Sequence, residues 1–384
     1  MKPSDRMLKL PASGTLSVGQ NIRALRAAGQ DIINLAGGQP DPPPPVSVIS
    51  VDLTGPLNSL GDPAGRLELR HAIAARLQRY AGLTYVADTD LVLTIGGKYG
   101  ILTALMTVAD AGQCVAVFDP CWPTYQAALQ LAGLQAVPLK LHGPDFRIRA
   151  EDLVKMPWRE VSGIILNTPH NPTGRVFTRE ELDAVADVAR AHDLWVISDE
   201  SFDNLVYGEN KHISIARLPD MRERTLVVTS FSKSFALPGL RMGSIAGPKE
   251  VVAFATRFIE QTLSCVSPIL QEAALDALCV EDEWRTRART AFEEKYSAAL
   301  DILKRSKRIR ASQPEGTFYL FPEIETQGLT SEDLRKHALS NGVGVIAGSA
   351  FGAAGEGHLR INLIGCLDEI SNGLNRLVRA IDGW

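Results

Sequence analysis

The sequence predicts a mainly parallel α/β sheet wrapped by helices, followed by a smaller α+β domain. From residue 91 onward, short apolar runs rich in β-branched residues alternate with longer amphipathic stretches. The runs are LVLTI at 91–95, CVAVF at 114–118, GIILN at 163–167, LWVIS at 194–198 and TLVVT at 225–229. Such alternation of strand-like and helix-like periods is typical of an open sheet with helices between its strands.

One segment between these runs carries a clear helix start. In TREELDAVADVARAHD, at 178–193, Thr178 and Glu181 have the spacing of a capping box. Apolar Leu182 and Val185 follow at helical spacing, so we expect this helix to pack one face against the sheet.

Changes in composition divide the chain into three parts. Pro-rich DPPPP at 41–45 interrupts regular structure, so residues 1–45 are expected to form an N-terminal arm and part of a small domain. Residues 46–275 are expected to form the large domain. In residues 276–384 a long charged helix leads to FYLFPEI, VGVIAG and HLRINL, which predicts the C-terminal small domain.

Composition predicts a protein whose partners are small molecules. The chain has 384 residues, 45% of them hydrophobic, a formal net charge of -4 and a pI near 6.0. Because no long Lys/Arg run accompanies this balance, we expect no nucleic-acid partner. The sequence has no run of 18 apolar residues and no signal-type N-terminus, so we expect no membrane partner and a cytoplasmic location. Five scattered cysteines predict reduced thiols and no metal site.

The densest chemical signal is TSFSKSFALPGLRMG at 229–243. Lys233 stands between Ser232 and Ser234, close to Ser230, and Arg241 follows eight residues later. A lysine beside small hydroxyl residues and one arginine is suited to an anionic ligand. An isolated Ser-x-Ser-Lys is ordinarily a surface lysine, so the hypothesis depends on other features.

Five further residues stand where an α/β fold places ligands. Asp199 ends the run LWVISD, and Asn171 lies in NTPHNPTG after another predicted strand. Gly97 opens a helix whose free N–H groups suit a phosphate. Trp122 could stack on a planar ring, and Arg360 could bind a carboxylate. Taken singly, each has a plain structural explanation as a turn, a core residue or a surface ion pair.

Together these features resemble the fold type I pyridoxal-phosphate enzymes, and among them the class I aminotransferase family with its bacterial aspartate aminotransferases. The positions that carry the resemblance, in chain order, are Gly38, Gly65, Gly97, Lys98, Trp122, Asn171, Asp199, Lys233, Arg241 and Arg360. The resemblance implies a large cofactor-binding domain on a mainly parallel seven-stranded sheet, a smaller α+β domain, and a homodimer with shared active sites.

The implied activity is transfer of an amino group between an amino acid and a 2-oxo acid. Lys233 would hold pyridoxal 5'-phosphate as a Schiff base and move the substrate α-proton, while Asp199 would face the pyridine nitrogen. Asn171 would bind the phenolic oxygen of the ring, and Trp122 would cover the ring face. The other residues expected to contact the cofactor, most of them at its phosphate, are Gly97, Lys98, Phe202, Ser230, Ser232 and Arg241.

The same resemblance implies how the substrate binds. Arg360, helped by Asn171 and Gly38, would hold the α-carboxylate, with Trp122 alongside. Lys98 stands where bacterial aspartate aminotransferases have a lysine that helps to receive a side-chain carboxylate, so aspartate or glutamate is the expected substrate. Alternatively, Lys98 only adds positive charge near the phosphate.

Two tyrosines of the family are replaced in this chain. Phe202, three residues after Asp199, and Leu60, five residues before Gly65, stand where relatives usually have tyrosine. Without a hydroxyl at position 202, the Schiff base should titrate at higher pH. These replacements leave an alternative open, namely elimination, replacement or cyclisation chemistry in a natural-product pathway, with S-adenosylmethionine as a substrate in some such enzymes.

A role without catalysis is the other alternative. Related domains serve as ligand sensors in transcriptional regulators, where a winged-helix segment precedes them. The stretch before Gly38 is too short for such a segment, so we expect an enzyme.

Overall fold

The central sheet matches the predicted class. The computed structural model describes the chain except for residues 12–13, 38–42, 45–58 and 326–327. Within the described residues, seven strands form one sheet in the order β2-β8-β7-β6-β5-β3-β4. Only β8 runs against its neighbours, so the sheet is mainly parallel. The strands are β2 (Leu91–Thr94), β3 (Cys114–Asp119), β4 (Gln135–Lys140), β5 (Val161–Asn167), β6 (Trp195–Asp199), β7 (Thr225–Ser230) and β8 (Gly243–Ala246).

Successive residues of each central strand point to opposite faces of the sheet, and helices cover both faces. In β3, Val115 and Val117 pack in the core beneath α4, α5 and α9. Ala116 and Phe118 of the same strand pack on the other face, with α6 and α7. The helices around the sheet are α3 (Leu67–Ala81), α4 (Gly97–Val108), α5 (Thr124–Ala132), α6 (Ala150–Lys155), α7 (Arg179–Ala191), α8 (Phe231–Ser234), α9 (Lys249–Leu263) and α10 (Pro268–Cys279).

The predicted start of α7 is confirmed. The Thr178 hydroxyl accepts a hydrogen bond from the Glu181 amide, and the Glu181 carboxylate accepts one from the Thr178 amide. Leu182 and Val185 are buried on the face that packs against the sheet. The capping residues therefore set both the first turn and the orientation of this helix.

Two strands of the sheet lie outside the five predicted runs. β4 is an edge strand that contains Pro138 and leaves several side chains near solvent, so it lacks a continuous apolar run. β8 has four residues and begins with Gly243, where an added Cβ would lie 2.7 Å from the carbonyl oxygen of Thr229. Its buried position depends on neighbouring strands rather than on its own composition.

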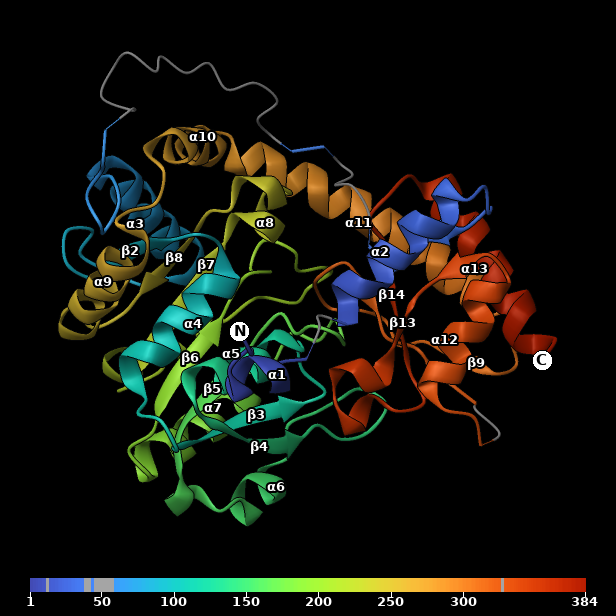
Figure 1. The fold of residues 1–384 in the computed structure, drawn as a ribbon, viewed down its shortest axis with the longest axis horizontal. Coiled ribbons are helices and arrows are strands. Elements are labelled where there is room, and N and C mark those ends of the chain that lie inside the picture. Colours follow the sequence, from blue (N-terminus) through green and yellow to red (C-terminus); the bar gives the residue numbers. More distant parts are fainter. Residues whose placement is uncertain (12–13, 38–42, 45–58, 326–327) are drawn as a thin grey trace.

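The C-terminal helices and strands pack beside the sheet, and α2 and β1 from the beginning of the chain pack with them. β1 (Ile33–Asn34) pairs with β12 (Val343–Gly344), and Arg26 of α2 forms an ion pair with Glu369 of α13. Figure 1 shows α2, in blue, among the orange and red elements. These elements are α2 (Gly14–Ala27), α11 (Glu281–Leu303), α12 (Ser331–Ser340), α13 (Leu367–Asp382), β9 (Ile309–Arg310), β10 (Tyr319–Leu320), β11 (Glu323–Ile324), β13 (Ile346–Ala347) and β14 (Leu359–Asn362). The short helix α1 (Asp5–Lys9) precedes them and has no buried residue.

The longest of these helices is α11, with 23 residues and many charged side chains. It runs from α10, above the sheet, to the C-terminal elements (Figure 1). In the described parts of the chain, no helix is long and apolar enough to cross a membrane.

The packing of Gly163 against Trp195 can be tested by adding one methyl group. A Cβ on Gly163 would lie 2.1 Å from Cδ2 of the Trp195 ring on the paired strand. We expect Gly163→Ala to lower the free energy of unfolding by about 1–3 kcal/mol, because the ring must shift within a packed sheet. Denaturant unfolding would measure this. Ser162→Ala on the same strand is the control, and an equal loss in both variants would contradict the tight contact.

Candidate active site

A cavity of about 530 Å³ lies at the carboxyl edge of the sheet. Asn167, Asp199 and Ser230 end three neighbouring strands, and all three line it. The C-terminal elements close the other side with Tyr319 and Arg360. In open α/β sheets this edge is the usual ligand site, and the volume is in the range of small-molecule pockets.

The cavity collects the residues that the sequence predicts, wherever the structure describes them. Gly38 lies outside the described residues, but its neighbour Gly37 lines the cavity. Leu60, which is not among the residues predicted for this site, does not line the cavity and is 83% exposed. The predicted residues that line the cavity are Gly97, Lys98, Trp122, Asn171, Asp199, Phe202, Ser230, Ser232, Lys233, Arg241 and Arg360.

Lys233 lies on the short helix α8, which begins where β7 ends. The Ser230 hydroxyl caps this helix by accepting a hydrogen bond from the Ser232 amide at 3.3 Å. The Lys233 amine lies 5.3 Å from the centre of the Phe318 ring. Among the described residues it has no carboxylate partner, so its amine is available to a ligand in the cavity.

Asp199 is a buried carboxylate held by hydroxyl groups. It accepts hydrogen bonds from the Tyr125 hydroxyl at 2.7 Å and from the Ser201 hydroxyl at 2.6 Å. Burial raises the pKa of Asp199, and these hydrogen bonds oppose that rise only in part. In the described part of the chain no cation pairs with Asp199, so a ligand with a protonated nitrogen would complement it.

A positive, glycine-lined corner lies at the start of α4. Arg241 donates hydrogen bonds to the Ile95 carbonyl at 3.2 Å and the Ser232 hydroxyl at 3.4 Å. Gly96 has a φ of +82°, which favours glycine, and an added Cβ would lie 2.7 Å from the Arg241 guanidinium. Desolvation and the charge of Arg241 both lower the pKa of Lys98. Two cations beside helix N–H groups make a site for an anion such as a phosphate.

The guanidinium of Arg360 lies on the side of the cavity that the C-terminal elements form. Nη1 of Arg360 donates to the Asn171 side-chain oxygen at 3.1 Å. The guanidinium lies between two rings, 4.2 Å from the centre of Tyr319 and 4.8 Å from that of Phe351. Its Nε is buried without a partner among the described residues, and burial lowers the pKa of Arg360. A guanidinium that is fixed by one hydrogen bond and still has an N–H group to donate is suited to a carboxylate.

Phe202 presents an apolar ring at this site. It packs edge to face against Phe318 and Tyr319, with ring centres 5.4 and 5.7 Å apart. The position therefore belongs to an aromatic wall and offers no hydroxyl to a ligand. Trp122 packs edge to face on Tyr125, and its ring centre lies 5.6 Å from the Lys98 amine.

The sequence did not reveal three residues that organise the site. Tyr125 and Ser201 hold Asp199, and Asn167 links two segments by donating to the Asp199 carbonyl and accepting from the Asn171 amide. A signal existed for Tyr125, because it stands three residues after Trp122 at the start of a helix. The partners of Asn167 could not be predicted without the order of the strands.

His170 supports the turn that carries Asn171. It is buried, and its Nδ1 lies 2.7 Å from the Thr173 hydroxyl. Burial, with help from the charge of Arg175, lowers the pKa of His170 to about 3. The imidazole therefore stays neutral and serves as a structural hydrogen-bonding group.

Comparison with known proteins relates this site to one enzyme family. The family model for class I and II aminotransferases matches residues 30–381. An aspartate aminotransferase of Pyrococcus abyssi is 32% identical, with 92% of this chain and 93% of that protein aligned. The aromatic-amino-acid aminotransferase 2 of Thermococcus litoralis is also 32% identical, with 92% of each aligned. The structure of Thermus thermophilus aspartate aminotransferase with maleate superimposes with a TM-score of 0.90 at 28% identity, covering 99% of this chain and 100% of the other.

His170 predicts a specific acid sensitivity. In the unfolded chain a histidine takes up a proton near its ordinary pKa of 6.5, whereas folded His170 does so only near 3. The unfolded state therefore binds more protons in this window, and stability falls as the pH drops through it. Compared with His170→Asn, the native protein should lose about 1.4 kcal/mol more for each pH unit between about 6 and 4. Unfolding curves at several pH values would measure the difference, and parallel losses in both proteins would contradict it.

Proposed function

The chain belongs to the class I and II aminotransferase family, and we propose that it works with pyridoxal 5'-phosphate bound in the cavity around Lys233. It is an aminotransferase, which moves an amino group between an amino acid and a 2-oxo acid. The relatives and solved structures reported above carry aminotransferase names, which favours this reaction over elimination, replacement or cyclisation.

The observation that carries the proposal is a set of unpaired groups around one cavity. Asp199 is a buried carboxylate without a cation, and the start of α4 with Lys98 and Arg241 is a cationic corner without an anion, both within the described residues. These groups match the ring nitrogen and the phosphate of pyridoxal 5'-phosphate, and the Lys233 amine matches its aldehyde. When bound, the cofactor supplies an electron-withdrawing ring and an aldehyde carbon that bonds to amines.

The residues of the chain divide the remaining work. The Asp199 carboxylate keeps the proton on the ring nitrogen, and Tyr125 and Ser201 keep that carboxylate in place. Arg241, Ser230, Ser232 and the first amides of α4 hold the phosphate. Trp122 covers the ring.

Proton transfer and orientation fall to three further residues. Asn171 uses its side-chain oxygen for Arg360, which leaves its Nδ2 to donate to the phenolic oxygen. Arg360 binds the α-carboxylate and so orients the bond from the α-carbon to hydrogen. The Lys233 amine would take that proton from the α-carbon and deliver it to the former aldehyde carbon of the cofactor, because a neutral amine is a base and, once protonated, an acid.

Substrate preference follows from Lys98. With Lys233 assigned to the cofactor aldehyde, Arg241 to the phosphate and Arg360 to the α-carboxylate, Lys98 is the remaining cation among the described residues of the cavity wall that can meet a second carboxylate. We therefore propose a dicarboxylic amino acid, aspartate or glutamate, as a substrate. A relative named aspartate aminotransferase supports this choice.

Assembly and location extend the proposal. We propose a cytoplasmic homodimer, in which residues 46–275 form the large domain, residues 276–384 the small domain and residues 1–45 an arm. Its support is the resemblance to the family, together with the exposed apolar side chain of Leu60. Relatives use a tyrosine at this position to reach the partner's site.

The central test is amino transfer by the purified protein with added pyridoxal 5'-phosphate. We expect aspartate or glutamate to remove the yellow absorption of the bound cofactor, and a 2-oxo acid to restore it while a new amino acid forms. Borohydride reduction followed by peptide mass analysis should place the cofactor on Lys233. Lys233→Ala should abolish both results, whereas exposed Lys155→Ala should change neither. Release of ammonia without a new amino acid would overturn the proposal.

The role of Lys98 has its own test. Lys98→Gln should raise the KM for aspartate about tenfold or more, since a charge-assisted hydrogen bond contributes about 1.5–3 kcal/mol. The KM for an amino acid with an apolar side chain should stay nearly constant. If Lys98 instead acts near the phosphate, cofactor affinity will fall and both substrates will be affected alike.

A further inference from the structure

Ser234, the residue after Lys233, is fixed by hydrogen bonds from several elements. The Ser234 hydroxyl donates to the Asp203 carboxylate at 2.8 Å and to the Ser201 carbonyl at 3.2 Å. The Ser234 carbonyl accepts from Asn204 Nδ2 at 3.1 Å and from Trp284 Nε1 at 2.7 Å. Ser234 is buried, and it is the last residue of α8. The end of the lysine helix is therefore held through both its side chain and its backbone.

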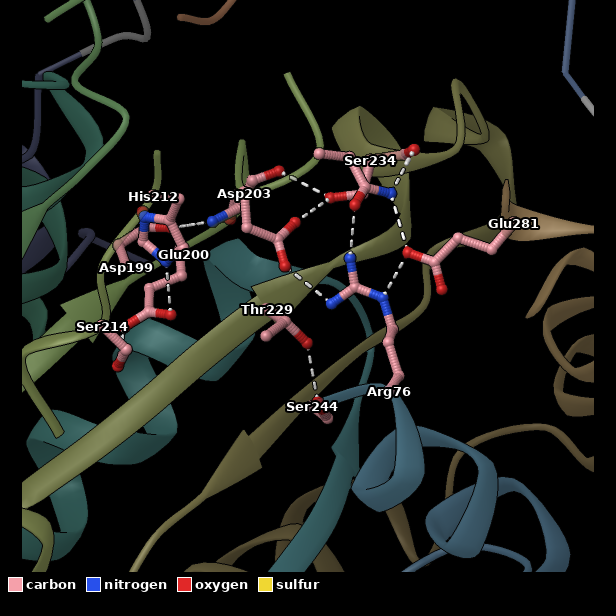
Figure 2. A network of polar contacts seen from close by, with 12 residues as sticks. Arg76, Asp199, Glu200, Asp203, His212, Ser214, Thr229, Ser234, Ser244 and Glu281 are labelled. Carbon is pink, nitrogen blue, oxygen red and sulfur yellow. Dashed lines mark hydrogen bonds and ion pairs between the residues drawn. The ribbon is translucent and has the colours of Figure 1, made fainter. Parts of the chain in front are cut away.

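Arg76 of α3 joins these partners into one hydrogen-bond network. Its three nitrogens donate to Glu281 at 2.8 Å, to Asp203 at 2.6 Å and to the Asn204 side-chain oxygen at 2.9 Å. Asn204 also donates to Glu281 at 3.0 Å. Figure 2 shows Arg76 between Asp203 and Glu281, with Ser234 on the far side. Because every side-chain nitrogen of Arg76 has an acceptor, this network has one preferred geometry.

The network links Lys233 to the segment that follows Asp199. Ser201, Asp203 and Asn204 follow Asp199 within five residues, and all three contact Ser234. The separation between the Asp199 carboxylate and the Lys233 backbone is therefore set by hydrogen bonds within the protein. Trp284 contributes from another element, the first turn of α11, and its side chain also lines the cavity.

We propose that Trp284 is a positioning residue for Lys233. Its indole N–H holds the Ser234 carbonyl, so the end of α8 stays fixed while the Lys233 amine moves between the cofactor aldehyde and the substrate α-carbon. This inference rests on the proposed function. A small displacement of an acid or base lowers the rate of proton transfer far more than it lowers binding.

The test is Trp284→Phe, which keeps an aromatic ring and removes the N–H donor. We expect kcat to fall about tenfold with KM changed less than about twofold, because the loss concerns alignment of the base. The visible circular dichroism of the bound cofactor should change as well, since it reports how the lysine-bound ring is oriented. Ser234→Ala, which removes the hydrogen bonds of the Ser234 side chain, should change both readouts in the same direction.

Trp158→Phe is the matched control. Trp158 is also buried, and its indole donates to the Leu153 carbonyl at 2.5 Å, away from the cavity. It should lose comparable stability while kcat and the dichroism stay as in the native protein. If Trp284→Phe matches Trp158→Phe in kcat and dichroism, the positioning role is wrong. If the native protein transfers no amino group, the proposed function fails, whereas the dichroism still tests the hold on α8.

Discussion

The site depends on a carboxylate that is buried without a cation among the described residues. Asp199 ends a central strand, where removal from water disfavours its charge and raises its pKa. Hydroxyl groups of Tyr125 and Ser201 orient the carboxylate but cannot neutralise it. A cationic ligand therefore gains from binding here, and the rest of the cavity is arranged around that requirement.

Charge is distributed unevenly around this carboxylate. Lys98, Lys233, Arg241 and Arg360 all line the same cavity, and none forms an ion pair within the described residues. Like charges in one pocket oppose folding unless anions bind there, so these cations indicate ligands with more than one negative group. The phosphate of the proposed cofactor and the α-carboxylate of the proposed substrate would account for two of these anions, and the side chain of a dicarboxylic substrate would supply a third.

Two layers of contacts fix the positions of the side chains around the cavity. Arg360, Asn171 and Asp199 line the cavity. Ser234, Asp203 and Arg76 are not among its lining residues and have each other as partners (Figure 2). The first layer can exchange partners when a ligand binds. The second layer is satisfied without a ligand, so it can stay constant through a reaction. Phe202 and Phe318, whose rings pack edge to face, add an apolar wall to the cavity.

The sequence by itself determined the sheet class, the capped start of α7 and the residue types that meet at the site, because these are carried by periodicity and short motifs. Edge strand β4 and antiparallel β8 were missed, since neither has a continuous apolar run. Only the tertiary structure decided that Tyr125 supports Asp199 and that Trp284 reaches Ser234. Such partners lie 50 or more residues apart, so their pairing depends on strand order and helix packing, which no local pattern encodes.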